Sequence, residues 1–281
     1  MKVLVTGAAG QLGTELVAVF ERGGHEVVGT THATLDISQP SAVEECVAAV
    51  KPNFIVHAAA WTAVDACESD AEKAFAVNGT ATASLVSAAE KVGARVAYVS
   101  TDYVFDGSKK SAYVETDAVN PQSVYGASKL AGEQALRDVD LTVRISWVCG
   151  FHGANMVKTI LRIASAQPEL TFVNDQVGHP TFADDAAGMI VTLVEHEQQG
   201  IFHVTNQGAV SWHGFAQEVL RAAGLDPSRV LPVATADLQP PRPAPRPANS
   251  ILENAALAQA GFTLLDDFRI PLVRLVQRLN Q

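Results

Sequence analysis

The 281-residue sequence has few cysteines and no long hydrophobic run. Its three cysteines, Cys46, Cys67 and Cys149, show neither CxxC nor metal-ligand spacing, and the odd number argues against a disulfide framework. We interpret them as small buried side chains. No run approaches the roughly 18 apolar residues of a membrane span. The chain opens directly on KVLVT, without a charged segment and a cleavable apolar stretch, so we expect a cytoplasmic protein.

Basic charge is also scarce, since 20 Lys and Arg stand against 30 Asp and Glu and give a net charge of −10. This balance argues against a surface for nucleic acid or for an anionic membrane, and we expect neither as a partner. A phosphorylated small molecule can still bind through a few placed donors and helix N-termini. The 48% hydrophobic and 18% charged residues are typical of a globular protein.

Alternating strand and helix patterns organise the first half of the chain. Apolar runs predict strands, and periodic segments predict helices, at 2–6, 11–22, 25–29, 38–50, 54–60, 69–92, 95–100, 122–133 and 141–146. Short connections between them predict an α/β fold with a Rossmann-type doubly wound parallel sheet. We assign residues 1–147 to a dinucleotide-binding domain, joined by returning segments near 183–206.

Residues 148–281 mainly form a smaller C-terminal lobe in this interpretation. The predicted elements there are helices over 155–165, up to about 196 and over 212–223, a loop over 174–185 and a strand over 201–205. The segment PPRPAPRP at 240–247 should be extended. It is either a plain linker or, through Arg242 and Arg246, a segment that faces an anion.

Three glycines follow the first predicted strand and open the first predicted helix. Gly7, Gly10 and Gly13 lie in GAAGQLG, with GxxGxxG rather than GxGxxG spacing. A strand, a glycine turn and a helix are typical of a dinucleotide site, because the turn lets the backbone approach a pyrophosphate and helix N–H groups hold its charge. The alternative is a glycine-rich loop without a ligand.

An acidic residue is missing where a site for NAD usually has one, about 20 residues past the glycines. Thr30, Thr31 and His32 stand there instead, and nothing among them would repel a 2′-phosphate. We therefore favour NADPH, with NADH as the alternative. Asp36 is close enough in sequence to border an adenine pocket, or it forms a turn or helix cap.

Tyr125 and Lys129 stand four residues apart in the predicted helix over 122–133. At helical pitch they project from one face, so a phenol and an ammonium group can address one substrate atom together. The alternative is a packed ring beside a solvated charge. Thr101, Asp102 and Tyr103 directly follow the predicted strand over 95–100, at the strand ends that face the ligand crevice of a parallel sheet.

Seven segments together resemble the extended short-chain dehydrogenase/reductases, and within them the reductases of dTDP-linked 4-keto sugars. They are TGAAGQLG at 6–13, AAAWTAVD at 58–65, STDYVFDG at 100–107, YGASKLAGE at 125–133, RISWV at 144–148, NDQVGHPT at 174–181 and RPANS at 246–250. The resemblance spans nearly the whole chain. Cys149 and His179 depart from its pattern, at positions that touch substrate choice more than the reaction.

The resemblance implies an oxidoreductase that uses NADPH to reduce the 4-keto group of dTDP-4-dehydro-L-rhamnose to dTDP-L-rhamnose. Tyr125 would donate a proton to the keto oxygen, and Thr101 would hydrogen-bond the same oxygen. Lys129 would lower the pKa of the phenol and bind the nicotinamide ribose. These three residues are the predicted catalytic set.

The resemblance also assigns binding residues. The predicted cofactor contacts are Gly7, Gly10, Gln11, Leu12, Asp36, Ile37, Ala58, Ala59, Ala60, Tyr125 and Lys129. Tyr103 and Trp147 would contact the sugar, unless they are core aromatics. Asn155, Lys158 and Arg246 would bind the nucleotide diphosphate, with a solvated helix charge as the alternative for Lys158.

Partners and competing functions stay open at this point. Some relatives have a Mg²⁺-linked dimer contact through glutamates, to which Glu15 could correspond, but we assign no metal ligands and leave Mg²⁺ and a homodimer open. One competing function is reduction of another dTDP-4-keto-deoxysugar, as in dihydrostreptose or antibiotic pathways. The other is a non-catalytic regulatory subunit of the methionine adenosyltransferase type, against which the intact Thr101, Tyr125 and Lys129 argue.

Overall fold

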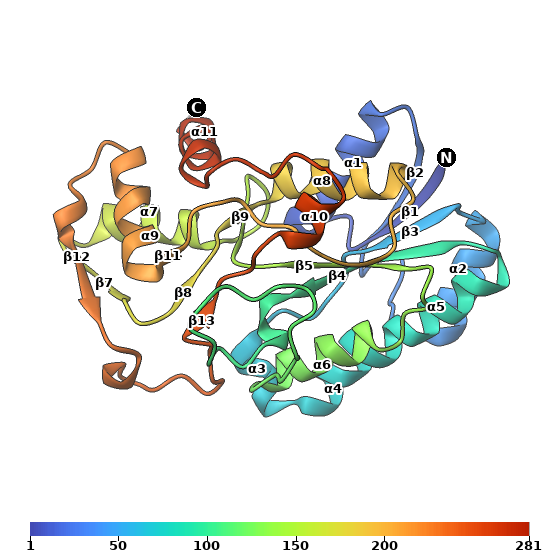
Figure 1. Cartoon of the computed structure of the whole chain (residues 1–281), viewed down its shortest axis with the longest axis horizontal. Helices are drawn as coiled ribbons and strands as arrows, with labels where there is room; N and C mark the ends of the chain where they lie inside the picture. The colour runs from blue at the N-terminus through green and yellow to red at the C-terminus, as the bar shows by residue number, and fades with distance from the viewer. Residues whose placement is uncertain (281) are drawn as a thin grey trace.

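A six-stranded parallel sheet forms the centre of the larger part of the computed structural model, which describes residues 1–280 (Figure 1). Its strands stand in the order β10-β5-β4-β3-β1-β2, and every neighbouring pair is parallel. Their bounds are β1 (Lys2–Thr6), β2 (Glu26–Thr30), β3 (Phe54–His57), β4 (Arg95–Thr101), β5 (Leu141–Ile145) and β10 (Gly200–His203). The order changes direction between β1 and β3, so the carboxyl ends of these strands open a crevice for a ligand.

Helices cover both faces of this sheet, because the strands bury side chains on both sides. Val3 and Val5 face a core shared with α1 (Gln11–Arg22) and α8 (Ala183–Glu195). Leu4, which points the opposite way, packs in the core of α2 (Pro40–Val50) and α5 (Ala81–Lys91). The predicted doubly wound α/β fold is therefore confirmed.

The helix predicted over 69–92 is confirmed to within two residues, because helical structure runs without interruption from α4 (Ala71–Phe75) through a π-helical turn over Ala76–Thr80 into α5. A separate short helix, α3 (Val64–Ser69), precedes it. Asp70 ends α3 and caps α4, since its side chain accepts a hydrogen bond from the Lys73 backbone N–H.

The π-helical turn carries the buried Asn78. The amide nitrogen of Asn78 donates to Ser128 Oγ, 3.0 Å away, and to the Trp61 carbonyl, while its oxygen accepts from the Trp61 N–H at 2.8 Å. The widened turn thus ties the loop after β3 to α6 (Val124–Glu133). The strand predicted over 54–60 ends at His57, so Ala58 to Ala60 belong to this loop.

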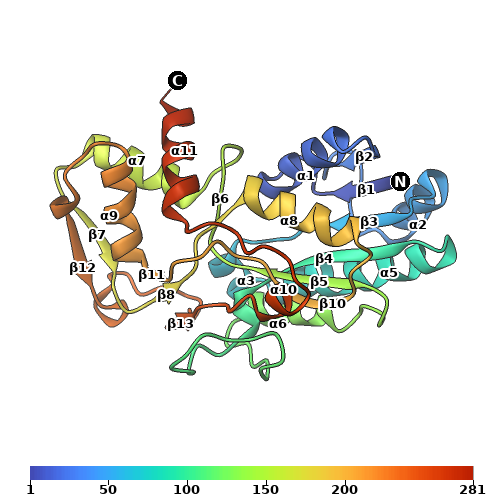
Figure 2. The same ribbon diagram turned by 45° about the horizontal axis from the view of Figure 1, so that its top comes forward.

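A second, smaller lobe has its own core, separate from the sheet in Figures 1 and 2. It contains α7 (Met156–Ala166), β7 (Leu170–Val173), α9 (Trp212–Ala222), β12 (Val230–Val233) and α11 (Arg269–Leu279). Apolar residues at helical spacing, such as Val157 and Ile160 of α7, face this core and explain why the segment folds as a helix. The helices predicted over 155–165 and 212–223 are confirmed to within a residue.

Short elements complete the chain. The segment predicted as a loop over 174–185 contains two short strands and the first turn of α8. The short elements are a 3-10 turn over Asp102–Val104, β6 (Val148–Cys149), β8 (Val177–Gly178), β9 (Thr181–Phe182), β11 (Val210–Ser211), 3-10 turns over Pro227–Arg229 and Thr235–Asp237, β13 (Asn249–Ser250) and α10 (Ala255–Gln259).

Two further sequence predictions, on the cysteines and on membrane-spanning segments, can be compared with the structure. All three cysteines are unpaired, with Cys67 and Cys149 buried and Cys46 half-buried. Across residues 1–280, the structure contains no helix with both the length and the apolar character to cross a membrane.

Candidate active site

The turn between β1 and α1 shapes a cradle of backbone atoms. Gly7 has φ of +72°, a conformation that favours glycine. A Cβ on Gly13 would lie 2.1 Å from the Gly7 carbonyl oxygen, and a Cβ on Gly7 would lie 2.8 Å from the Ala59 backbone. Gly10 precedes α1 without a side-chain cap, which leaves the first N–H groups of the helix available to an anion. This geometry fits a dinucleotide pyrophosphate.

Two cavities adjoin at this cradle. The first, of about 400 Å³, we call the cofactor cavity, and the second, of about 430 Å³, the reaction cavity. Gly7, Gly10, Ala58 and Ala60 line both, so the two cavities form one elongated site. Every residue predicted to contact the cofactor lines one of them: Gly7, Gly10, Gln11, Leu12, Ala58, Ala60, Tyr125 and Lys129 line the reaction cavity, and Asp36, Ile37 and Ala59 line the cofactor cavity.

Asp36 forms a turn and also lines a cavity, so its predicted place beside an adenine stays a prediction. It lines the cofactor cavity, and its Oδ1 accepts hydrogen bonds from the backbone and hydroxyl of Ser38, which lower the pKa of the carboxyl. Trp61 and Lys73 also line this cavity, with the ammonium group 4.6 Å from the indole centroid. The sequence analysis assigned neither of these two residues a role, although Trp61 directly follows the small residues that admit a cofactor.

Helix α6 places Tyr125 and Lys129 in the reaction cavity, as predicted. Ser123 caps this helix by accepting from the Gly126 N–H at 3.1 Å. A Cβ on Gly126 would lie 2.2 Å from the Tyr103 carbonyl oxygen, so the glycine lets the helix approach the end of β4. The alternative of a packed ring beside a solvated charge does not hold, because the Lys129 side chain that would carry this charge is only 2% exposed.

Burial controls the electrostatics of the Tyr125 and Lys129 pair. It lowers the pKa of Lys129 to about 7, while its Nζ donates to the Val99 carbonyl at 2.7 Å and lies 4.0 Å from the Tyr98 ring centroid. Burial also raises the pKa of the Tyr125 phenol. The expectation that Lys129 lowers this pKa is therefore not met, because desolvation dominates and the ammonium is directed to a carbonyl.

Thr101 and Asp102 end β4 beside the phenol. The Thr101 hydroxyl donates to Asp102 Oδ1 at 3.0 Å and accepts from the Tyr103 N–H. Asp102 is 2% exposed, its second oxygen has no partner among the described residues, and burial raises its pKa to about 6. The sequence located Asp102 at this strand end but assigned it no role.

Aromatic rings form the far wall of the reaction cavity. Trp147 has φ of +46°, and its indole stacks on Trp212 with 3.6 Å between ring centroids. A Cβ on Gly178 would lie 2.8 Å from the Trp147 ring, so this glycine makes room for the indole. Tyr103 meets Tyr125 edge to face at 5.5 Å. Sequence reasoning missed Trp212, which it treated only as the start of a helix.

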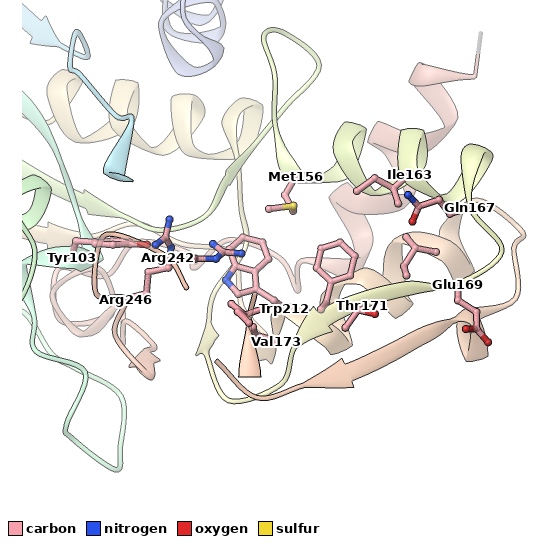
Figure 3. A pocket seen from close by; sticks show the side chains of 13 residues that line it. Tyr103, Met156, Ile163, Gln167, Glu169, Thr171, Val173, Trp212, Arg242 and Arg246 are labelled. Carbon is pink, nitrogen blue, oxygen red and sulfur yellow. The ribbon is translucent and has the colours of Figure 1, made fainter. Parts of the chain in front are cut away.

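A third cavity of about 390 Å³, which we call the lobe cavity, extends from the reaction cavity into the smaller lobe (Figure 3). Tyr103 and Trp212 line both cavities. Figure 3 shows the guanidinium groups of Arg242 and Arg246 between these two rings. The two arginines of the segment 240–247 therefore lie in a cavity where they could face an anion, as the sequence suggested.

Two predicted diphosphate ligands do not line any of the three cavities. Asn155 caps α7 through its side-chain oxygen and donates to Gln11 Oε1 at 3.1 Å. The Lys158 ammonium donates to the carbonyls of Phe151 and Gly153. Both side chains bind the loop before α7. The sequence alone does not distinguish this structural role from ligand binding.

Glu15 lies on α1 and is nearly buried, with His152 Nε2 3.6 Å from its carboxylate. Among residues 1–280, no three His, Cys, Asp or Glu side chains are grouped so that they could hold a metal ion.

Comparison with known proteins connects this geometry to a family. The family model described as the RmlD substrate binding domain matches residues 1–281. The chain belongs to this family. The RmlD-family chain is 41% identical to a dTDP-4-dehydrorhamnose reductase of Burkholderia thailandensis over 96% of each chain. It is 36% identical to a dTDP-4-keto-6-deoxy-D-glucose reductase of Streptomyces niveus over 99% of this chain and 97% of the relative.

A solved structure carries a bound cofactor. The dTDP-4-dehydrorhamnose reductase of Bacillus anthracis in complex with NADP superimposes with a TM-score of 0.94 at 35% identity, and the match covers 99% of each chain. The RmlD-family chain thus shares the overall fold of a protein that binds NADP.

The two departures from the family pattern lie behind the cavity walls. Cys149 is 1% exposed, and the buried His179 directs its ring nitrogen to the Leu252 carbonyl at 3.1 Å. Neither residue of this RmlD-family chain lines any of the three cavities described above. Any influence that they have on substrate choice must pass through their neighbours.

Proposed function

We propose that the chain is an NADPH-dependent dTDP-4-dehydrorhamnose reductase, which converts dTDP-4-dehydro-L-rhamnose to dTDP-L-rhamnose. The observation that carries the proposal is the reaction cavity itself, in which Thr101, Tyr125 and Lys129 meet. The cavity opens on one side to the glycine cradle and on the other to the two arginines of the lobe cavity. Relatives at about 40% identity with this printed activity support it.

The glycine cradle and the N-terminus of α1 would hold the cofactor pyrophosphate, and Asp36 and Ile37 would border the adenine. The bound cofactor supplies a hydride to the keto carbon. Lys129 would bind the nicotinamide ribose from its place beneath the cavity. NADPH is the proposed cofactor and NADH the alternative, since no acidic residue ends β2.

Tyr125 would donate its proton to the 4-keto oxygen, so that hydride and proton together turn the carbonyl into a secondary alcohol. Its raised pKa keeps the phenol protonated at neutral pH, although it also makes the phenol a weaker acid. Thr101 would hydrogen-bond the oxygen as its charge develops, after its hydroxyl turns away from Asp102 Oδ1. Lys129, with a pKa of about 7, would be able to exchange protons near neutrality.

The sugar would lie between Tyr103 and Trp147, whose rings suit the apolar side of a deoxyhexose. Arg246 would bind the diphosphate. We therefore propose that residues 1–147, with the returning segments near 183–206, bind the cofactor, and that 148–281 mainly bind the nucleotide sugar. A cytoplasmic location, a homodimer and a Mg²⁺ contact at Glu15 stay predictions.

Tyr125→Phe tests the reaction. The substrate is prepared from dTDP-glucose with the dehydratase and epimerase steps, and NADPH consumption is followed. We expect unchanged NADPH affinity and a fall in kcat of roughly 100-fold to 10,000-fold. Tyr113→Phe removes a comparable buried phenol oxygen outside the three cavities and should keep kcat. Near wild-type turnover by the Tyr125 variant would exclude the assignment.

Reduction of another dTDP-4-keto-deoxysugar is the second candidate, because the Streptomyces niveus relative carries that kind of name over 99% of this chain. The same cavity could hold a sugar of different stereochemistry. Turnover of a panel of dTDP-4-keto sugars, with NMR of each product, separates the two candidates.

A further inference from the structure

The segment over residues 240–247, which we call the arginine strap, makes few backbone hydrogen bonds. Five of its eight residues are prolines, which have no N–H to donate. Beyond it, the Ala248 carbonyl accepts from the Val177 N–H at 2.8 Å and β13 pairs with β8. Within it, the Ala244 N–H donates to Asp65 Oδ1 at 3.1 Å. Asp65 is therefore an anchor of the part of the strap that carries the arginines.

Asp65 also forms a bidentate ion pair with Arg246. Nη1 donates to one carboxylate oxygen at 2.9 Å and Nη2 to the other at 2.7 Å, while Nη1 also reaches the Ala244 carbonyl. This pair uses the end of the guanidinium group. The Nε–H and the second Nη2 hydrogen form a separate fork on its side, which takes no part in the pair.

Charge in the lobe cavity is unbalanced near the strap. Arg242 and Arg246 both line it, and burial together with its positive neighbour lowers the pKa of Arg242. The hydrogen bond from Arg246 lowers the pKa of Asp65, so this carboxylate is ionised and compensates one cation. Asp65 itself does not line the cavity, and Glu169, the carboxylate that does, lies away from the arginines in Figure 3.

Asp65 comes from the other side of the site. It lies in α3, which follows the loop of Ala58 to Ala60 that lines the cofactor cavity. The ion pair thus joins the sheet side of the molecule to a segment that is 181 residues away in sequence. Its Arg246 partner is 11% exposed, whereas the Asp65 carboxylate is 43% exposed.

We infer that Asp65 is a positioning residue for substrate binding: it fixes the arginine strap and turns the side fork of Arg246 toward the substrate diphosphate. The inference rests on the proposed function, in which Arg246 binds that diphosphate. Asp65 itself does not touch the substrate. Its carboxylate acts by holding the end of the guanidinium group and the Ala244 N–H in place.

The affinity for dTDP, measured by calorimetry on the full chain with NADP⁺ bound, tests this role. Asp65→Ala should weaken dTDP binding about tenfold, and Asp65→Asn, which keeps one acceptor oxygen, should weaken it less. KM for the keto sugar should rise with little change in kcat, and NADPH affinity should stay the same. Asp267→Ala, which breaks an Asp–Arg pair in the smaller lobe whose aspartate is similarly exposed, should leave dTDP affinity unchanged.

An Arg246→Ala background separates positioning from general damage to the strap. Without the guanidinium group, Asp65 keeps only its bond from the Ala244 N–H and has no fork of Arg246 to orient, so Asp65→Ala should then cost much less dTDP affinity than it does in the wild type. An equal loss in both backgrounds overturns the inference, as does wild-type or tighter binding by the single Asp65→Ala variant. If the wild-type chain bound no dTDP, the proposed function would fail as well, whereas wild-type binding that ignores Asp65 refutes this inference alone.

Discussion

Replacing Glu133 by glutamine tests the buried ion pair that supports helix α6. Arg144 of β5 donates to the two oxygens of Glu133 at 3.0 and 2.7 Å. The Arg144 and Glu133 side chains are only 3% and 6% exposed, so water cannot solvate the charge that remains when one partner is neutralised. Because α6 also carries Tyr125 and Lys129, this pair connects the stability of the sheet to the reaction cavity.

The substitution leaves a buried guanidinium group beside a neutral amide. Removing one partner of a buried pair typically costs about 3–5 kcal/mol. Because glutamine keeps a side-chain carbonyl oxygen that can accept from Arg144, we expect a loss of about 3 kcal/mol. Urea unfolding at neutral pH measures this loss in the free energy of unfolding. Glu133 also raises the pKa of Lys129, so the variant should lower that pKa further.

Glu44→Gln is the matched control, because Glu44 and Lys91 form a pair of 2.8 Å with both side chains 56% exposed. An exposed pair of this kind contributes at most about 1 kcal/mol. If Glu133→Gln lost no more stability than Glu44→Gln, burial would not be what gives the Arg144 pair its strength.

Two further predictions concern the cradle and the lysine. Gly13→Ala should abolish NADPH binding or folding, because the added Cβ would lie 2.1 Å from the Gly7 carbonyl oxygen; a variant that binds NADPH normally in a fluorescence titration contradicts the backbone contact. Burial lowers the pKa of Lys129 from 10.5 to about 7, so above about pH 7 the unfolded chain binds more protons than the folded one. The stability of the wild type relative to Lys129→Met should therefore rise by about 1.4 kcal/mol per pH unit between about pH 8 and 9, and a flat difference in urea unfolding would refute this.

The parallel sheet could be predicted because most of its strands are short apolar runs that alternate with helical patterns, and the glycine cradle could be predicted because sterics dictate it. Gly7 and Gly13 must lack a side chain wherever this turn exists. Tyr125 and Lys129 share a face by helical geometry alone. These features depend on residues that are close in sequence.

The remainder depends on contacts between distant segments. The helix predicted over 69–92 contains a π-helical turn at Asn78, whose amide binds a loop and a second helix that no local pattern reveals. The pKa of Tyr125 follows from burial, which the spacing to Lys129 does not report. Lys158 has the positive charge that a phosphate ligand needs, but its ammonium group donates to carbonyls of the loop before its own helix.

The placement of the tryptophans has a practical consequence. The sequence contains three: Trp61 lines the cofactor cavity, Trp147 lines the reaction cavity, and Trp212 lines both the reaction cavity and the lobe cavity. All indole emission of this chain therefore originates at cavity walls. A molecule that enters any of the three cavities changes the surroundings of at least one fluorophore, so binding can be followed by intrinsic fluorescence without a label.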